Sequence, residues 1–407
     1  MSRESSEISR ELLLALPKTD LHVHLDGSLR LSSLIELARE HGVELPSETE
    51  SGMNELVFKP SYANLPEYLA GFAYTCAVMQ DHESLTRIAY ELAWDNINEG
   101  VRYVEVRFAP QLHMGAGMSC EDVLVAVNAG LAQARREHEG SDAVRGGEPG
   151  FRYGIIVCAL RMFTPAFSAW YAQLCELLPN APKTSLYADA SLELARAAVR
   201  ARDERGLPVV GFDLAGQEDG YPAHDHMAAF QYAHANFLKK TVHAGEAYGA
   251  ESIFDAITAL NADRIGHGYH LFSPELIGPA VEDPQAYTRA LTNYIADRRL
   301  TIEVCITSNL QTNPAIGDVA NHSLAQMLAA RMSVTICTDN RLVSHTTVTD
   351  ELALAVKNFE LTHKQLRNTL IHGFKRSFFP GTYAEKRAWV RRVIDYHDAV
   401  AADFQAR

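Results

Sequence analysis

The sequence has few cysteines, no excess of positive charge and no long apolar run, and each absence excludes a class of protein. Its six cysteines form no Cys-x-x-Cys pair, which excludes a zinc knuckle and a thioredoxin-like redox site. The formal net charge of −14 is the opposite of the basic footprint that nucleic-acid binders need. No run approaches the length of a membrane span. We therefore expect neither a nucleic-acid partner nor a membrane partner.

Two further absences bear on compartment and fold. Residues 1–7 are polar and acidic, without the apolar stretch of a signal peptide. Cys158, Cys305 and Cys337 lie in apolar runs, which is typical of reduced core cysteines, so we expect a cytoplasmic protein. No Gly-x-Gly-x-x-Gly follows the first predicted strand, which argues against a doubly wound dinucleotide-binding sheet. The sequence leaves the oligomeric state open.

What the sequence does contain is a regular alternation of apolar, strand-like runs with helical patterns. Many of the runs are almost continuously apolar, as expected of parallel strands covered on both faces. The eight predicted strands are residues 20–25, 102–108, 152–160, 209–214, 240–243, 264–267, 301–306 and 333–337. This pattern predicts an α/β fold, a (β/α)8 TIM-like barrel with additional helices, formed by residues 1–407 as one domain.

The first predicted strand carries two histidines one residue apart, His22 and His24. Because side chains alternate along a strand, both imidazoles lie on one face, while Leu21, Val23 and Leu25 lie on the other. Two imidazoles so placed make a chelating pair for a metal such as zinc. Two unrelated histidines on a polar edge strand would give the same pattern, so the pair alone does not establish a site.

Imidazole and carboxylate groups recur where later strands end, and that end of a barrel carries catalysis. The fifth strand runs into His243 and Glu246, His267 ends the sixth between two glycines, and Asp339 follows the eighth. Glu246 is a candidate general acid or base, and His267 is a candidate proton acceptor. Each residue taken alone could have a structural role instead, such as a helix N-cap for Asp339. Their joint placement at the strand ends favours a catalytic zinc site. The predicted ligands are His22, His24, His243 and Asp339.

These residues lie in motifs that closely resemble the adenosine deaminase family of the amidohydrolase superfamily. The order and spacing of the motifs match from about residue 10 to residue 375. The motifs are TDLHVHLDGSLR (19–30), YVEVRFAPQLH (103–113), VVGFDLAGQE (209–218), VHAGEAYG (242–249), RIGHGYHL (264–271), SN (308–309) and CTDN (337–340). The resemblance implies the same barrel that the strand alternation predicts.

The resemblance also implies an activity, the zinc-dependent hydrolytic removal of the 6-amino group of adenosine or 2′-deoxyadenosine in purine salvage. One zinc ion per chain would be held by the four predicted ligands. Glu246 would donate a proton to ring N1, which requires a raised pKa in a closed pocket. His267 would act as base and electrostatic guide for the attacking water, and Asp339 would orient that water. The Pro-Cys-x-x-Cys motif of the other zinc deaminases is absent.

Several contacts to a small-molecule purine nucleoside are implied by the same resemblance. Gly216 would present its backbone amide to ring N3, Asp26 would meet the ribose 5′-hydroxyl, and His24 would also contact the substrate. Residues from about 43 to 80 would form a lid or helical insertion after the first strand. Within it, the sequence pattern predicts an irregular segment over residues 43–60 and a helical stretch over residues 65–79. Its candidate contacts, at the spacing of one helix face, are Tyr68, Leu69 and Phe72. The alternative for these three is simple burial against the barrel.

One position departs from the family pattern. Many members have Thr-Asp-Asp-Pro after the eighth strand, whereas this sequence has Asn340 and Arg341 after Asp339. The second aspartate would contact purine N7; Asn340 can donate an amide hydrogen there but carries no charge. Arg341 would reshape the rim or meet an acidic substituent. The same chemistry on adenine, a modified adenosine, aminofutalosine or an adenylate therefore stays open, as does an inactive binding homologue. Another metal hydrolase is disfavoured because residues 209–214 contain no metal-bridging lysine.

Overall fold

The computed structural model describes residues 8–115 and 117–406. Residues 1–7, from which the absence of a signal peptide is predicted, lie outside the described residues. Eight strands follow one another around the molecule in chain order, each parallel to the next. They are β1 (Lys18–His24), β2 (Val101–Phe108), β3 (Arg152–Leu160), β4 (Val209–Ala215), β5 (Lys239–Ala244), β6 (Arg264–His267), β7 (Thr301–Val304) and β8 (Ser333–Ile336). A parallel bridge between Val23 and Asp339 joins β1 to the chain after β8, so the barrel is nearly closed. The predicted (β/α)8 fold is confirmed.

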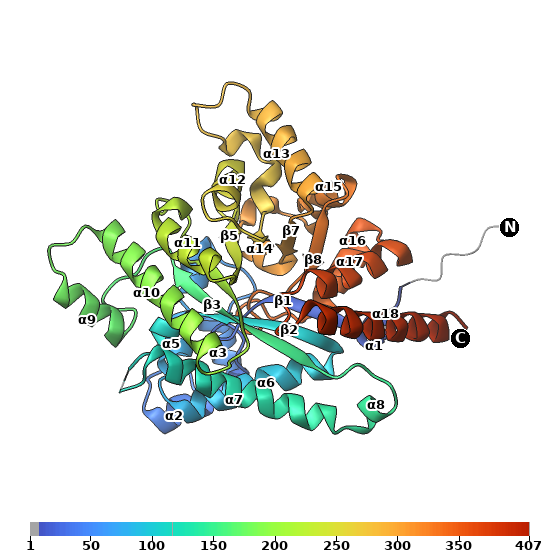
Figure 1. The fold of residues 1–407 in the computed structure, drawn as a ribbon, viewed down its shortest axis with the longest axis horizontal. Coiled ribbons are helices and arrows are strands. Elements are labelled where there is room, and N and C mark those ends of the chain that lie inside the picture. The colour runs from blue at the N-terminus through green and yellow to red at the C-terminus, as the bar shows by residue number, and fades with distance from the viewer. Residues whose placement is uncertain (1–7, 116, 407) are drawn as a thin grey trace.

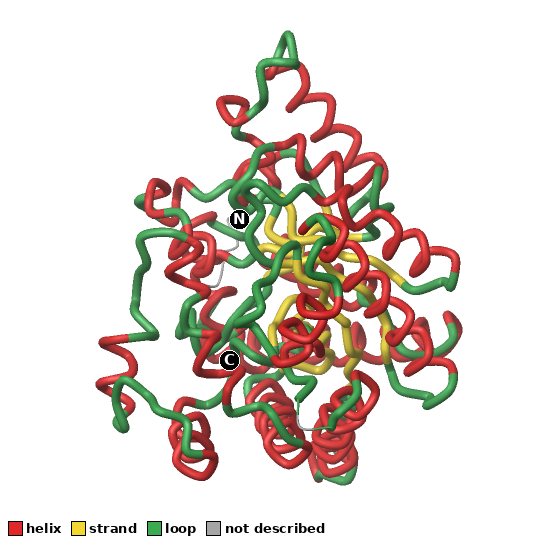
Figure 2. The backbone as a smooth tube through the Cα atoms, turned by 90° about the vertical axis from the view of Figure 1, so that its left-hand side faces the viewer, coloured by secondary structure: helices red, strands yellow, loops and turns green. Residues whose placement is uncertain are grey.

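Helices surround the strands, which gather in the interior of the molecule (Figures 1 and 2). In the first half of the chain these are α1 (Arg10–Ala15), α2 (Leu31–His41), α3 (Glu50–Leu56), α4 (Leu65–Leu69), α5 (Phe72–Ala77), α6 (His82–Asn98), α7 (Cys120–Glu139), α8 (Asp142–Arg145), α9 (Ala169–Leu177) and α10 (Lys183–Asp203). In the second half they are α11 (Met227–Ala235), α12 (Ala250–Thr258), α13 (Pro284–Arg298), α14 (Ile306–Thr312), α15 (Leu324–Ala329), α16 (Val348–Phe359), α17 (His363–Arg376) and α18 (Tyr383–Ala406). None of the helices in the described residues is long and apolar enough to cross a membrane.

Strand β1 has the two faces that its sequence predicts. Leu21 and Val23 are fully buried in apolar clusters formed with the surrounding helices. The imidazoles of His22 and His24 lie on the other face, where each ring centroid is within 5.4 Å of another histidine ring. The hydrophobic effect therefore fixes the orientation of the strand, and the histidines follow from it.

Helix α17 covers the place where β8 meets β1. Gly373 on this helix faces both strands, because a Cβ atom built there would lie 2.1 Å from Thr19 Oγ1 and 3.2 Å from Thr335 Oγ1. Only glycine allows the helix backbone to approach this closely. The close contact supports the two strands at which the barrel closes.

The segment from residue 43 to residue 80 contains more helix than its sequence predicts. The prediction that residues 43–60 are irregular is wrong, because α3 begins at Glu50 with Thr49 as its N-cap. The predicted continuous helix of residues 65–79 is instead two short helices, α4 and α5, separated at Ala70 and Gly71. Tyr62 of this segment donates a hydrogen bond at 3.1 Å to the carbonyl oxygen of Val343, in the loop after β8.

The end of the seventh strand is also shorter than predicted. Strand β7 ends at Val304, and α14 begins at Ile306. Buried Glu351 accepts hydrogen bonds from the backbone N–H groups of Ile306 and Thr307, the first two residues of this helix. The motif residues Ser308 and Asn309 therefore lie on a helix at the carboxyl end of the barrel.

Candidate active site

The four predicted metal ligands converge at the carboxyl ends of β1, β5 and β8. Each of His22, His24, His243 and Asp339 offers one nitrogen or oxygen atom, and these atoms lie within 4.8 Å of one another. His24 Nε2 lies 3.1 Å from His243 Nε2, and Asp339 Oδ1 lies 3.4 Å from Nε2 of both His22 and His24. The structure therefore brings together all four side chains that the sequence predicts.

Two buried carboxylates hold the histidine ligands from behind. His22 Nδ1 donates a hydrogen bond to Glu303 Oε2 at 2.8 Å, and His243 Nδ1 donates to Asp213 at 3.1 Å. Arg107 pairs with both acids at 2.8 Å. Burial alone would raise the pKa of Glu303, but Arg107 and Arg264 hold it well below its usual range. Both acids are thus acceptors, and each histidine keeps Nε2 free for a metal.

The donor set fits a transition metal such as zinc. His22 Nε2 is buried and has no hydrogen-bond partner among the described residues. Ser308 Oγ donates to Asp339 Oδ2 at 2.6 Å, which leaves Oδ1 directed to the histidines. Three imidazole nitrogens and one carboxylate oxygen match the ligands that zinc takes in catalytic sites. An orphaned imidazole nitrogen in such a set is explained by a metal.

The backbone is strained at two of the predicted residues. Asp339 and His267 have φ angles of 64° and 62°, in the left-handed region that non-glycine residues rarely occupy. Asp339 is held there by backbone hydrogen bonds to β1, one from its N–H to His22 O at 2.8 Å and one to its carbonyl oxygen from His24 N–H at 2.7 Å. Strain of this kind is typical of functional sites.

Glu246 is buried next to these ligands, and its Oε2 lies 3.7 Å from His267 Nε2. Burial, and then the nearby charges of Asp339 and Glu218, raise its pKa well above the usual carboxyl range. Glu218 also holds the loop in place, because its carboxylate accepts hydrogen bonds from the four consecutive N–H groups of residues 245–248. The carboxyl of Glu246 therefore holds a proton more readily than an exposed carboxyl does, and its loop is fixed in position.

A chain of hydrogen bonds determines which nitrogen of His267 carries its proton. The backbone N–H of Leu324 donates to His322 Nδ1 at 3.0 Å, so the proton of His322 lies on Nε2. His322 Nε2 donates to Asn309 Oδ1, and Asn309 Nδ2 in turn donates to His267 Nδ1, each at 3.2 Å. Burial lowers the pKa of His322 to about 4 and that of His267 well below its usual value. His267 is thus neutral, with its proton on Nε2 facing Glu246.

Asp26 lies in a second buried group, beside the ligands. Its Oδ2 lies 3.9 Å from His113 Nε2, and Cys76 Sγ lies within 4.8 Å of both. Asp26 Oδ1 has no hydrogen-bond partner in the described residues, and burial raises the pKa of this carboxyl to about 7. The residue predicted to contact the ribose thus offers a free acceptor.

Asn340 contacts the predicted lid. Its Nδ2 donates at 2.8 Å to the hydroxyl of buried Tyr68, which lies 2.8 Å from Ser344 Oγ. A Cβ atom built on Gly27 would lie 1.8 Å from Asn340 Oδ1 and 2.9 Å from Phe72 Cζ, so Gly27 leaves room for both side chains. The helices of residues 43–80 therefore meet the loops after β1 and β8.

The other residues predicted to contact the substrate make fewer interactions that fix their position. Leu69 is half-buried on α4. Gly216 follows β4 directly, with a φ of 95°, at the same end of the barrel. Arg341 pairs with Glu99 and donates its backbone N–H to Ser28 Oγ, so its guanidinium already has a partner within the protein.

The comparison with known proteins agrees with this geometry. The family model of adenosine deaminase matches residues 17–184 and 183–396. The chain belongs to the adenosine deaminase family. An adenosine deaminase of Mycobacteroides abscessus is 36% identical over 392 residues, which cover 96% of this chain and 97% of that protein. Adenosine deaminase 1 of Streptomyces coelicolor is 35% identical over 380 residues, 93% of this chain and 86% of that one. The structure of an arabidopsis N6-mAMP deaminase is 27% identical, with a TM-score of 0.71, covering 95% of this chain and 99% of that chain.

Several residues that support the site in this member of the adenosine deaminase family receive no role from its sequence. They include Asp213, Glu218 and Glu303. A usable signal exists for two of these, because Asp213 and Glu303 are single acids inside otherwise uncharged strands. A buried charge is costly unless it is paired, so such an acid predicts a partner, although not which one.

Proposed function

We propose that this chain is a zinc-dependent deaminase that hydrolyses adenosine and 2′-deoxyadenosine to inosine, or 2′-deoxyinosine, and ammonia. The observation that carries the proposal is the convergence of four metal-ligand side chains with the pair Glu246 and His267. The names of the relatives, which are adenosine deaminases at 35–36% identity, support the substrate.

One zinc ion per chain would be held by His22, His24, His243 and Asp339. When bound, zinc acts as a Lewis acid that lowers the pKa of a water molecule to near 7. The buried acids Glu303 and Asp213 keep Nε2 of His22 and His243 directed to the metal.

Glu246 would supply the proton that the purine needs. Its raised pKa favours the protonated carboxyl, which can donate to ring N1 and make C6 electrophilic. His267 carries its proton on Nε2, and its Nδ1 is already occupied by Asn309. Of its two predicted roles, electrostatic guide and base, we therefore propose the first, with Nε2–H directing the attacking water. Asp339 would orient that water and accept its proton, which leaves with the amino group as ammonia.

The nucleoside would be held by groups around these residues. Asp26, with its free acceptor, would bind the ribose 5′-hydroxyl, and the backbone amide of Gly216 would bind ring N3. Asn340 has a second amide hydrogen besides the one bonded to Tyr68, and it would donate this hydrogen to N7. His24 and the apolar side chains Leu69 and Phe72 would complete the enclosure.

Other 6-aminopurines are expected to be poorer substrates than adenosine and 2′-deoxyadenosine. Adenine would leave the free oxygen of Asp26 without a partner. An adenylate needs a cation for its phosphate, and three arginines at the carboxyl ends of the strands already have acceptors. Arg107 bonds Asp213 and Glu303, Arg161 bonds the carbonyl oxygens of Tyr221 and His243, and Arg341 bonds Glu99. We therefore propose that nucleosides are better substrates than nucleotides. The disfavoured nucleotides include the N6-methyl nucleotide that the name of the arabidopsis structure mentions.

The test is a panel of 6-aminopurines followed by ultraviolet absorbance and ammonia release. We expect the highest kcat/KM for adenosine and 2′-deoxyadenosine, with adenine and adenylates at least tenfold lower, because each leaves a polar group unpaired. A zinc-loaded protein that deaminates none of the panel would refute the proposal. A protein that prefers a nucleotide would refute the substrate but keep the chemistry.

A further inference from the structure

A large cavity lies at the opposite end of the barrel from the candidate active site. It measures about 1180 Å³ and is bordered by the first residues of β3, β4 and β5, together with α18 and the chain before it. These strands enter the barrel here, whereas the metal ligands lie where strands leave it. The volume exceeds what a drug-sized ligand needs. The cavity is thus a separate place in the molecule, and deamination makes no use of it.

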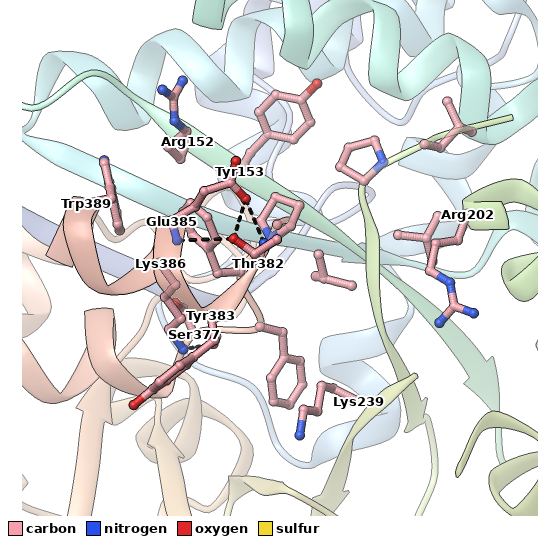
Figure 3. A pocket seen from close by; sticks show the side chains of 18 of the residues that line it. Arg152, Tyr153, Arg202, Lys239, Ser377, Thr382, Tyr383, Glu385, Lys386 and Trp389 are labelled. Carbon is pink, nitrogen blue, oxygen red and sulfur yellow. Dashed lines mark hydrogen bonds between the residues drawn. The ribbon is translucent and has the colours of Figure 1, made fainter. Parts of the chain in front are cut away.

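The cavity is cationic in a protein whose formal net charge is −14. Its lining includes one acid, Glu385. The carboxylate of Glu385 accepts hydrogen bonds from the backbone N–H and the hydroxyl of Thr382, the residue before α18. The basic side chains of the lining are Arg135, Arg152, Arg202, Lys239, Lys386 and Arg392. They come from α7, β3, α10, β5 and α18, and Figure 3 shows Lys386 on one side with Lys239 and Arg202 on the other. Cations that surround a hollow favour an anion inside it.

Several of these cations are only partly neutralised. Arg152 pairs with Glu139, and Arg202 pairs with Asp203. Lys239 Nζ lies 3.7 Å from the nearest Asp263 oxygen, and Lys386 donates to backbone carbonyl oxygens. Exposed Arg392 makes no ion pair within the described part of the chain. Arg135 Nε lies 4.0 Å from Glu139 Oε2, and Trp389 Nε1, another donor of the lining, is buried without a hydrogen-bond acceptor in the described residues.

Aromatic side chains complete the lining. Phe237 is 92% exposed and Tyr383 is 75% exposed, although both rings are large and apolar. Phe237 also has a φ of 59°, a left-handed conformation that is unfavourable for a bulky residue. Exposed rings beside cations are the combination that binds bases and phosphates together, because every base has a π-face that can stack.

We propose that this cavity binds a nucleotide, with its phosphates on the arginines and lysines and its base against Phe237 or Tyr383. Arg392 is the cation best placed to take the phosphates, because it makes no ion pair within the described residues, and Lys239 has only the 3.7 Å contact to Asp263. The site is independent of the proposed deaminase activity.

Calorimetric titration of the full-length, zinc-replete protein with uridine 5′-triphosphate tests the proposal. This nucleotide has no 6-aminopurine, so it is no substrate of the proposed reaction. We expect binding of uridine 5′-triphosphate, weaker binding of inorganic tripolyphosphate and none of uridine. Arg392→Gln and Lys239→Gln should each weaken binding about tenfold, as expected for a lost charge-assisted contact. Tyr383→Ala should weaken the nucleotide but not tripolyphosphate.

The matched control is Arg391→Gln, since Arg391 is also an exposed arginine on α18, lies outside the cavity lining and pairs with Asp395. It should bind the nucleotide like the wild type. The absence of nucleotide binding, equal losses in the Arg391 and Arg392 variants, or tripolyphosphate binding as tight as the nucleotide would overturn the proposal. Adenosine turnover is measured in all variants and should be unchanged, so failure of the deaminase proposal is seen separately.

Discussion

Glu303 Oε2 lies 2.8 Å from His22 Nδ1 and accepts a second hydrogen bond from Arg107 at the same distance. Glu303 lies on β7 and His22 lies on β1, so their contact crosses the interior of the barrel. Through it, residues that never meet the substrate determine which nitrogen of His22 is left for the metal. The orientation of the metal ligand His22 thus depends on a contact in the barrel interior.

Replacing this acid should weaken the metal site without destroying it. In Glu303→Gln, the amide removes the negative charge and offers His22 only one acceptor atom, so we expect zinc affinity to fall about 10- to 100-fold. Competition with a chelator measures the affinity, and adenosine turnover should partly recover at saturating zinc. Exposed Glu282→Gln is the control and should bind zinc like the wild type. An unchanged affinity in Glu303→Gln would show that this contact does not hold the ligand.

The proton position on His267 has its own test. In Asn309→Asp, a carboxylate would face His267 Nδ1, so the proton should move to that nitrogen. We expect kcat to fall about 100-fold at unchanged zinc content, because Nε2 no longer donates toward the reaction. Nitrogen-15 chemical shifts of the histidines report the tautomer directly. A wild-type His267 protonated on Nδ1 would contradict the proposed role, whatever the rate of the variant.

Much of this site follows from sequence because its main determinants are local. Alternation along β1 predicts that His22 and His24 share a face, and the buried side chains of Leu21 and Val23 on the opposite face make that prediction reliable. His243, His267 and Asp339 follow from the rule that strands of a barrel end at one rim.

The supporting contacts could not be predicted, because they depend on three-dimensional proximity. Nothing local indicates that Glu303 faces His22, or that Glu218 accepts four backbone N–H groups from the loop of Glu246. The break between α4 and α5 could not be predicted for a similar reason. Residues 65–79 have helical spacing, but Tyr68 on α4 forms hydrogen bonds with Ser344 and Asn340, which lie far away in the sequence.

Asn340 can be tested with a substrate that lacks N7. If its free amide hydrogen bonds N7, the wild type should prefer adenosine to 7-deazaadenosine by about 10- to 100-fold in kcat/KM. Asn340→Ala should lose most of that preference while retaining zinc. Asn340→Asp should keep the contact to Tyr68, whose hydroxyl can donate to the new carboxylate. Equal discrimination in wild type and Asn340→Ala would remove N7 recognition from this residue.

Glu351 makes the stability of the protein depend on pH. Burial raises the pKa of this carboxyl from 4.5 to about 7, although its oxygens accept hydrogen bonds from Ile306, Thr307 and Thr346. Between these two pH values the folded chain keeps a proton that the unfolded chain has lost. The contribution of Glu351 to stability is therefore complete below pH 4.5 and falls by up to about 1.4 kcal/mol per pH unit as the pH rises toward 7.

Urea unfolding of the metal-free wild type and of Glu351→Gln, from about pH 5 to pH 8, measures this effect. Glutamine does not titrate, so the free energy of unfolding of the wild type minus that of the variant should decrease up to about pH 7 and then stay constant. A difference that is constant over the whole range would show that the folded-state pKa of Glu351 is not raised.

The most direct measurement is adenosine deamination by metal-free protein as zinc is added, with Glu246→Gln alongside. We expect no ammonia without zinc and a rate that rises and saturates at one zinc per chain. Glu246→Gln should bind the same amount of zinc but turn over about 10²- to 10⁴-fold more slowly, because an amide cannot donate the proton to N1. Turnover that is indifferent to zinc, or a Glu246→Gln variant with near wild-type rates, would contradict the proposed function.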